Sequence, residues 1–197
     1  GMPFGTARNF AAKQAMDGGF QYLAFLDADN IPDDPNCYLR LRDTNLPLIS
    51  GVYRQRFPPF RIAAFNETRD ASGRLGAGEL PPFQWGTIVA ADYVPTGSML
   101  IRRDLLAAVV ARFKHPFVWT LEPFNGPEEP ARSEDYDFCN KARQLGIQPM
   151  LHTGVTFGHE VAGRLRAEDG AIEWGLFETP TQAVTAVDTI RLVARGA

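Results

Sequence analysis

Two carboxylates, Asp27 and Asp29, directly follow the apolar run at residues 22–26 and are candidates for ligand binding. In open α/β sheets, ligands bind beyond the carboxyl ends of strands. Carboxylate oxygens suit Mg²⁺ or Mn²⁺, and a metal held there could take up charge on a departing diphosphate. The competing interpretation is a plain turn, because Asp and Asn favour turns after strands.

Two further positions could carry chemistry. Glu134 and Asp135 follow Ser133 at a predicted helix start, where a carboxylate facing a cleft could act as a general base. Helix capping explains the same pattern, because Ser is a preferred cap and acids favour the first turn. His159 follows a short strand candidate and could be a metal ligand, although a lone histidine is also common as a hydrogen-bonded structural residue.

The helices and strands predicted around these residues alternate along the chain, which indicates an α/β fold. The apolar run at 22–26 predicts a strand buried on both faces, as in a parallel sheet. Residues 54–86 are rich in Pro, Gly and Arg, and we expect 61–65 and 86–90 to flank a hairpin-like excursion there. Residues 115–132 are expected to form a loop. Periodicity and stop signals predict helices over 7–17, 37–42, 105–113, 134–145 and 181–194, and further strands at 48–53, 98–101, 148–151 and 155–157.

Length and composition narrow the class of protein. The chain has 197 residues, 45% hydrophobic and 22% charged, which is ordinary for a soluble globular protein. The net charge of −3 gives no basic excess for nucleic acid or an anionic membrane. No apolar run approaches the ~18 residues of a transmembrane segment. Without a signal-peptide pattern, and with only two cysteines, we expect a cytoplasmic protein.

Several short motifs follow one another along the chain in an order that is typical of one enzyme family. They are Ala7-Arg8-Asn9, Asp27-Ala28-Asp29, Gly97-Ser98-Met99-Leu100-Ile101-Arg102-Arg103, Ser133-Glu134-Asp135-Tyr136-Asp137 and Gly158-His159. This series, over about residues 7–160, resembles the glycosyltransferases of the GT-A fold, especially the family-2-like group. The resemblance implies a three-layer sandwich with a mainly parallel sheet. It also implies a shortened N-terminus, because the family's usual first strand-helix-strand unit would precede Ala7.

The resemblance divides the chain into a shortened GT-A-like domain at 1–160 and an extension at 161–197, whose helix packs on the same domain. It also implies roles for individual residues. Asp27 and Asp29 would bind Mn²⁺ or Mg²⁺ and the ribose-diphosphate of a nucleotide-sugar, with His159 as the third metal ligand. Asp135 would be the general base, and Glu134 beside it would contact the acceptor or the sugar. Arg8, Asn9, Gly97 and Ser98 would also bind the donor, and Trp85 and Trp119 are candidates for stacking an acceptor sugar, with ordinary packing as the alternative.

The function implied is metal-dependent transfer of a sugar from a nucleotide-diphosphate donor to a glycan or another hydroxyl acceptor. A homo-oligomer or a partner chain would complete the shortened fold by covering its sheet edge. The alternative is a non-catalytic GT-A-like module that binds a glycan, a nucleotide or a partner protein. Nucleotidyl transfer ranks last, because the chain has no glycine-rich, basic N-terminal loop. The residues leave open the donor sugar, its base, the acceptor and the stereochemical outcome.

Overall fold

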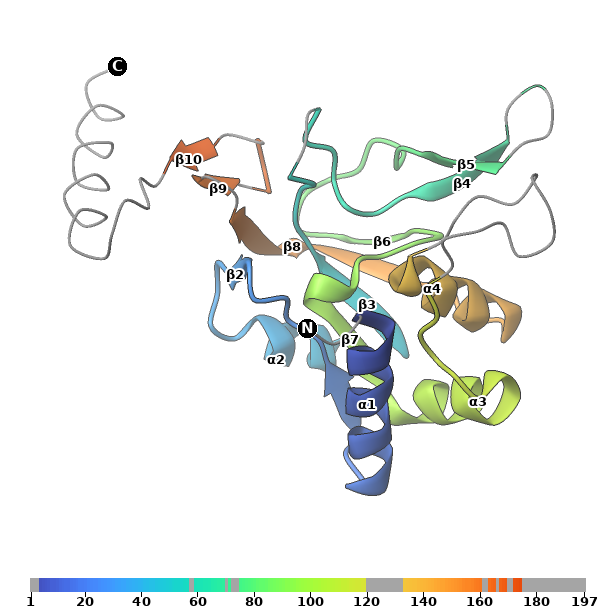
Figure 1. The fold of residues 1–197 in the computed structure, drawn as a ribbon. Coiled ribbons are helices and arrows are strands. Elements are labelled where there is room, and N and C mark those ends of the chain that lie inside the picture. The colour runs from blue at the N-terminus through green and yellow to red at the C-terminus, as the bar shows by residue number, and fades with distance from the viewer. Residues whose placement is uncertain are drawn as a thin grey trace, which may run out of the picture.

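The computed structural model describes residues 4–56, 59–69, 71, 75–119, 133–160, 163–165, 167–169 and 172–174. They form an α/β fold with helices on both sides of a curled sheet (Figure 1). The helices are α1 (Phe4–Asp17), α2 (Cys37–Asp43), α3 (Arg103–Phe113) and α4 (Glu134–Gln144), with a 3₁₀ turn η1 (Thr96–Ser98). The strands are β1 (Tyr22–Ala24), β2 (Asn30–Pro32), β3 (Leu48–Val52), β4 (Asn66–Arg69), β5 (Leu75–Gly78), β6 (Ile88–Ala90), β7 (Met99–Arg102), β8 (Met150–Glu160), β9 (Gly163–Leu165) and β10 (Ile172–Trp174).

The sheet is mixed, with strand order β1-β7-β3-β8-β9-β10, and β2 and β6 also pair with β8. Within the described strands, β3 and β8 are the one parallel pair, and the other pairings are antiparallel. The expectation of a mainly parallel sheet is therefore wrong for this part of the chain. A continuous apolar run indicates that a strand is buried on both faces, but it does not determine whether the neighbouring strand is parallel or antiparallel.

The central strand β3 is buried on both faces. In β3, Leu48 and Val52 join the core beneath α1, α3 and α4, whereas Ile49 joins the core beneath α2. This alternation follows from the two-residue period of a strand. The strand expected at 22–26 differs, because β1 pairs only with β7 among the described strands and Ala24 is exposed.

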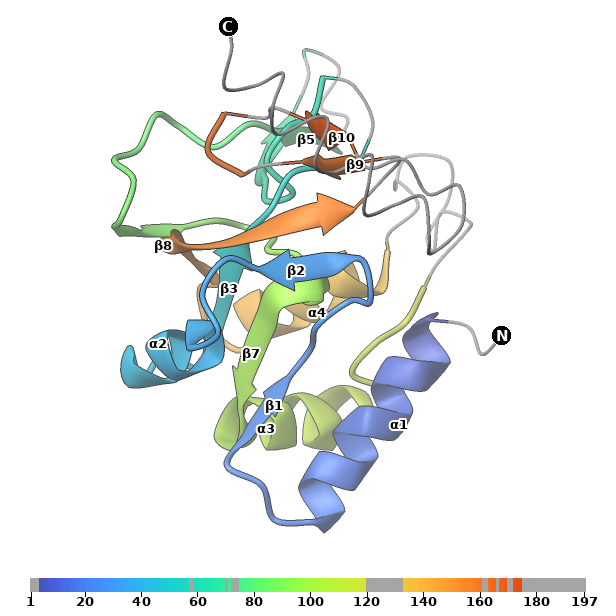
Figure 2. The ribbon, with the colours of Figure 1, turned by 90° about the vertical axis from the view of Figure 1, so that its left-hand side faces the viewer.

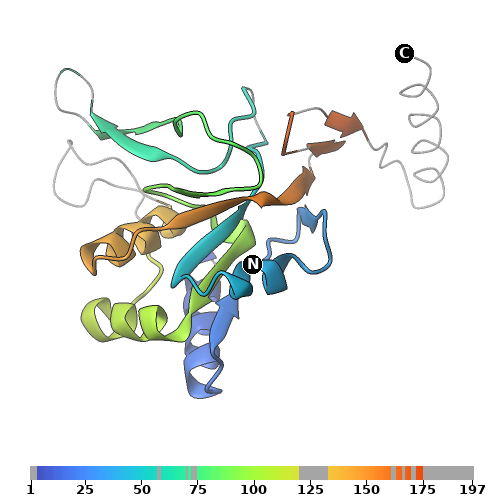
Figure 3. The same ribbon diagram turned by 180° about the vertical axis from the view of Figure 1, so that it is seen from behind.

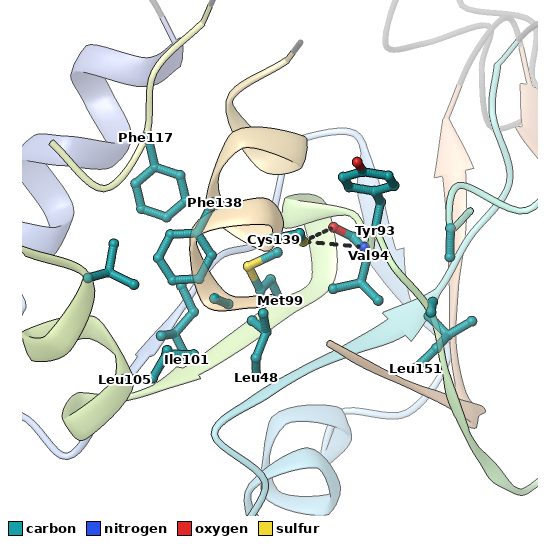
Figure 4. Packing of buried hydrophobic residues seen from close by; sticks show 14 of the residues in the cluster. Leu48, Tyr93, Val94, Met99, Ile101, Leu105, Phe117, Phe138, Cys139 and Leu151 are labelled. Carbon is teal, nitrogen blue, oxygen red and sulfur yellow. Dashed lines mark hydrogen bonds between the residues drawn. The ribbon is translucent and has the colours of Figure 1, made fainter. Parts of the chain in front are cut away.

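The larger core cluster packs α4 and α3 against β3 and β7 (Figure 4). Phe117 and Phe138 stack with ring centroids 4.7 Å apart. The thiol of Cys139 lies 3.4 Å from the backbone nitrogen of Val94, which donates to it. Cys139 and Cys37 are both buried and free. These contacts fix α4 relative to the segments that it packs against.

Other boundaries depart from the sequence-based expectations. The two short strands expected near 148–157 are one long strand, β8, whose residues alternate between buried and half-buried positions. The hairpin within 54–86 is formed by β4 and β5, and β6 pairs with β8 instead. In Figure 3 this hairpin lies at the opposite end of the molecule from α1. The helix expected at 181–194 lies outside the described residues. β9 pairs with β8 and lies just past residue 160, where the C-terminal extension is expected to begin.

One edge of the sheet gathers the segments that carry the motifs. Because β3 is parallel to β8 and antiparallel to β7, the carboxyl ends of β3 and β8 meet the amino end of β7. β1 is also antiparallel to β7, so its carboxyl end lies at this same edge. Figure 2 shows β1 beside β7 and β2 beside the end of β8. Within the described ranges, no helix is long and apolar enough to cross a membrane.

Candidate functional site

Arg8 joins two of the acidic groups that the sequence singled out. Its Nη1 donates to Glu134 Oε1, and its Nη2 donates to Asp27 Oδ1 at 3.0 Å. The side chains of Arg8 and Glu134 are only 8% and 5% exposed. A buried ion pair needs good geometry, since losing one partner leaves an uncompensated charge. Arg8 therefore ties α1, the start of α4 and the segment after β1 into one cluster.

Gly97 lies directly against Asp27, one member of this cluster. Its carbonyl oxygen accepts hydrogen bonds from the Asp27 backbone nitrogen and from Asn30 Nδ2, both at 3.2 Å. A Cβ at position 97 would collide with Asn30 Nδ2 and lie 2.7 Å from the Tyr53 hydroxyl and 2.9 Å from Asp27 Oδ2. The absence of a side chain at 97 is thus required by the close approach of three polar side chains.

A second group lies next to the first and centres on Arg56. Its Nη2 pairs with Asp29 Oδ2, and its Nε donates to His159 Nε2 at 2.9 Å. His159 Nε2 lies 3.8 Å from the same carboxylate oxygen of Asp29. The Tyr53 ring packs edge-on against the imidazole, with centroids 5.2 Å apart. The expected juxtaposition of Asp29 and His159 is present, and an arginine bridges the two.

The hydrogen bonds of His159 fix its tautomer. Its Nδ1 lies 2.6 Å from the backbone oxygen of Arg54, and a carbonyl oxygen only accepts, so Nδ1 carries the proton. Nε2 then presents its lone pair to the N–H of Arg56. Burial lowers the pKa of His159 below its ordinary value of 6.5, and the positive charge of Arg56 acts in the same direction. The imidazole is held neutral with Nε2 as the acceptor, which is the form that binds metals.

The donor atoms here fit a hard divalent cation only in part. A carboxylate oxygen and a neutral imidazole nitrogen 3.8 Å apart are suitable neighbours in one coordination sphere. Asp27, however, faces Arg8. Throughout the described residues, no group of three His, Cys, Asp or Glu side chains is arranged to hold a metal ion. The structure thus assembles the pair Asp29 and His159, and not the expected trio.

Asp135 lies at the start of α4, beside Glu134. Its Oδ1 accepts hydrogen bonds from the Ser133 hydroxyl and from the Tyr136 backbone nitrogen, the latter at 2.9 Å. Ser133 does stand at the N-cap position, but its hydroxyl bonds to Asp135 and caps no backbone N–H. Burial raises the pKa of Asp135 above its ordinary value of 3.8, against the lowering effect of Ser133 and Arg8. A carboxylate with a raised pKa is a stronger base, as general-base catalysis requires.

Two buried acceptor atoms at the site have no hydrogen-bond partner among the described residues. They are Oε2 of Glu134 and Oδ1 of Asn30. Glu134 Oε2 belongs to the carboxylate that Arg8 holds, and Asn30 lies against Gly97. An unpaired buried acceptor costs free energy, which a ligand hydroxyl or amide donor would recover.

Two of the expected donor-binding residues have structural roles here. Asn9 makes two bonds to the backbone of Phe117, through Nδ2 to the oxygen at 2.6 Å and through Oδ1 from the nitrogen at 2.9 Å. Ser98 is fully buried, with its hydroxyl 2.8 Å from the Ser50 hydroxyl and 2.9 Å from the oxygen of Gly51. Ser98 thus attaches η1 to β3, and Asn9 attaches α1 to the segment after α3.

The two candidate acceptor-binding tryptophans lie in different places. Trp119 is 48% exposed and stacks on Phe4 at 6.5 Å, and Phe4 in turn lies 5.9 Å from the guanidinium of Arg8. Trp119 is therefore one ring away from the site. Trp85 precedes Gly86, which lies against Gly154 in the middle of β8. Gly154 is five positions before His159, about 17 Å along a strand. The structure brings Trp119 toward the cluster and leaves Trp85 apart.

Sequence reasoning missed three residues of the site, Asn30, Tyr53 and Arg56. Asn30 directly follows Asp29 in the same polar run. Tyr53 is the last residue of the strand predicted at 48–53, and Arg56 comes just after that strand. The rule that ligands bind beyond the carboxyl ends of strands would have selected all three. Nothing in the sequence indicates that Arg56 reaches back to Asp29.

Comparisons with known proteins give information on the fold alone. No protein-family model matches this chain, and no curated protein matches it. Among solved structures, the crystal structure of A197 from STIV is similar, with a TM-score of 0.59 and 15% sequence identity. The match covers 86% of this chain and 75% of that one. At this level of identity the likeness shows that the two chains share a fold.

Proposed function

We propose that the protein is a glycosyltransferase of GT-A-like architecture, which transfers a sugar from a nucleotide-diphosphate donor to a hydroxyl acceptor. The observation that carries the proposal is the ion-pair cluster of Arg8, Asp27 and Glu134. These three residues come from separate motifs of the family resemblance, and Arg8 and Glu134 are 126 residues apart. Gly97, from a further motif, lies against Asp27.

The residues of the site divide the proposed work between them. Asp135 would take the proton from the acceptor hydroxyl, since its raised pKa makes it a better base than an ordinary aspartate. Glu134 Oε2 would accept a hydrogen bond from a sugar hydroxyl. Arg8 holds the carboxylate of Glu134 in place through the hydrogen bond from Nη1. A divalent cation held by Asp29 and His159 would stabilise the charge of the departing diphosphate. Mg²⁺ in such sites commonly takes one or two carboxylates and completes its shell with phosphate and water.

Calorimetric titration of UDP, GDP and the other nucleoside diphosphates, with and without Mn²⁺, tests the proposal. We expect one base to bind in the presence of Mn²⁺ and Asp29→Asn to abolish that binding. The matched control is Asp17→Asn, since Asp17 is an exposed carboxylate at the far end of α1. A nucleotide-sugar of the selected base should then be consumed when acceptor hydroxyls are supplied. Absence of binding for every nucleotide, with and without metal, would refute the proposal.

A second candidate, a non-catalytic nucleotide- or glycan-binding module, is favoured by one observation. Arg56 pairs with the carboxylate of Asp29 and donates a hydrogen bond to Nε2 of His159. The negative charge of Asp29 is therefore balanced without a metal ion. Such a module would bind its ligand without turnover and without Mn²⁺, and Asp135→Asn would leave binding unchanged. Metal-dependent turnover that is lost in Asp135→Asn would exclude it.

A further inference from the structure

One guanidinium holds both of the groups that the proposed function assigns to a divalent cation. The Nη2 of Arg56 pairs with the carboxylate of Asp29, and its Nε–H points at Nε2 of His159 at 2.9 Å. The tautomer of His159 is set by the Arg54 carbonyl oxygen, so Nε2 has a single lone pair to offer. That lone pair binds either an N–H or a metal ion, and not both.

The arrangement also balances charge in the metal-free protein. Asp27 and Glu134 share the guanidinium of Arg8, and Asp29 has that of Arg56. Without Arg56, the carboxylate of Asp29 would have no cationic partner within the part of the chain that the structure describes. A guanidinium carries a permanent positive charge, which suits it to this compensation.

We propose that Arg56 is a built-in counter-cation, which occupies the cation position between Asp29 and His159 and must turn away before a divalent metal binds. This inference rests on the metal site of the proposed function. The Arg56 side chain is 45% exposed, so it can move into solvent without leaving a buried charge. A phosphate group of the ligand offers the guanidinium a new partner, because Arg pairs readily with phosphate oxygens. Metal and phosphate then favour each other's binding.

Titration with Mn²⁺ alone, followed by calorimetry and by the electron paramagnetic resonance signal of free Mn²⁺, tests this inference. Arg56→Met keeps an unbranched apolar stem and removes the charge and the N–H donors. We expect Arg56→Met to bind Mn²⁺ at least about tenfold more tightly than the wild type, because the charge-assisted bonds no longer compete. The control is Arg61→Met, since Arg61 pairs with Glu79 at 3.1 Å and has no contact with Asp29 or His159.

A second variant tests whether the tighter Mn²⁺ binding of Arg56→Met depends on Asp29. Adding Asp29→Asn to Arg56→Met should return Mn²⁺ binding to the wild-type level or below, and circular dichroism melting checks that each variant is folded. Equal affinity in the wild type and Arg56→Met would overturn the counter-cation role while leaving glycosyl transfer standing. A lack of Mn²⁺ binding in both would overturn the counter-cation role and the metal site together. A separate titration of UDP and GDP reports on the donor site itself, so the two failures are distinguishable.

Discussion

Arg8 and Glu134 lie 126 residues apart in the sequence and form an ion pair that is almost entirely withdrawn from water. The pair connects α1 to the first turn of α4. Its arginine also holds Asp27, the residue that ends the extended segment after β1. The two helices and the sheet edge are therefore fixed relative to one another by the same charges that line the candidate site.

Loss of Arg8 should destabilise the whole fold. Arg8→Met leaves the carboxylate of Glu134 buried with no cation, and removing one partner of a buried pair costs about 3–5 kcal/mol. Urea unfolding followed by circular dichroism measures the change in free energy of unfolding. Lys13→Met is the control, because Lys13 forms an exposed pair with Asp17 on the same helix. If Arg8→Met unfolds at the urea concentration of the wild type, the pair does not hold the fold together.

Gly97→Ala should remove ligand binding. The added Cβ would meet Asn30 Nδ2 and crowd the Tyr53 hydroxyl at 2.7 Å, so these side chains must shift within the site. We expect nucleoside-diphosphate affinity to fall by about tenfold or more, because site geometry is held to within about 0.5 Å in working sites. The control is Gly76→Ala, since a Cβ there meets nothing nearer than the Thr68 hydroxyl at 3.5 Å. Unchanged affinity in Gly97→Ala would show that the close packing around Gly97 does not shape the ligand site.

The α/β class could be predicted from the sequence, and strand direction could not. Apolar runs at 48–53 and 98–101 locate β3 and β7 to within a residue or two, because burial on both faces leaves no polar alternation. Antiparallel pairing of these two strands follows from the path of the chain between them, which no local pattern records. The sequence predicts two strands where the structure has the single strand β8, because Thr153 and Gly154 interrupt the apolar pattern.

The acids of the site could be predicted, and their partners could not. Asp27, Asp29 and Glu134 stand at strand and helix ends, where local rules place polar groups. The pairing of Asp29 with Arg56 depends on a long side chain that reaches back across the end of β3. Asn9 shows the reverse case. It lies beside Arg8 in the same motif, yet its side chain faces the Phe117 backbone, because neighbouring residues on a helix point in different directions.

Asn9→Ala should therefore lower stability and leave ligand affinity unchanged. It removes two hydrogen bonds to the backbone of Phe117 and leaves that N–H and carbonyl without their partner. At about 1 kcal/mol for each bond, we expect a loss of about 2–3 kcal/mol in the free energy of unfolding. Urea unfolding and nucleotide calorimetry on the same preparation check both parts. A large loss of affinity in the folded variant would restore Asn9 to the donor-binding residues.

Asp135→Asn should raise stability at neutral pH while removing activity. Burial raises the pKa of Asp135, so the folded protein binds this proton more tightly than the unfolded chain does. The resulting stability is present below pH 3.8 and is lost as the pH rises through the raised pKa. At pH 7 the wild type therefore carries the cost of a buried charge, which Asn does not. The Asn oxygen still accepts from the Ser133 hydroxyl and the Tyr136 nitrogen, so the local structure is kept.

Thermal melts at pH 4 and pH 7 measure this difference, and the gain of Asp135→Asn over the wild type should be larger at pH 7. Asp137→Asn on the same helix is the matched control. Asp137 accepts from the Val118 nitrogen at 3.0 Å and pairs with Lys141, so its loss should destabilise. Turnover should fall at least about 100-fold in Asp135→Asn, the usual contribution of a general base. In the wild type, turnover should decline below the raised pKa of Asp135. Full turnover in Asp135→Asn would assign the base to another residue, and a lower melting temperature at pH 7 would show that the ionised carboxylate stabilises the helix start.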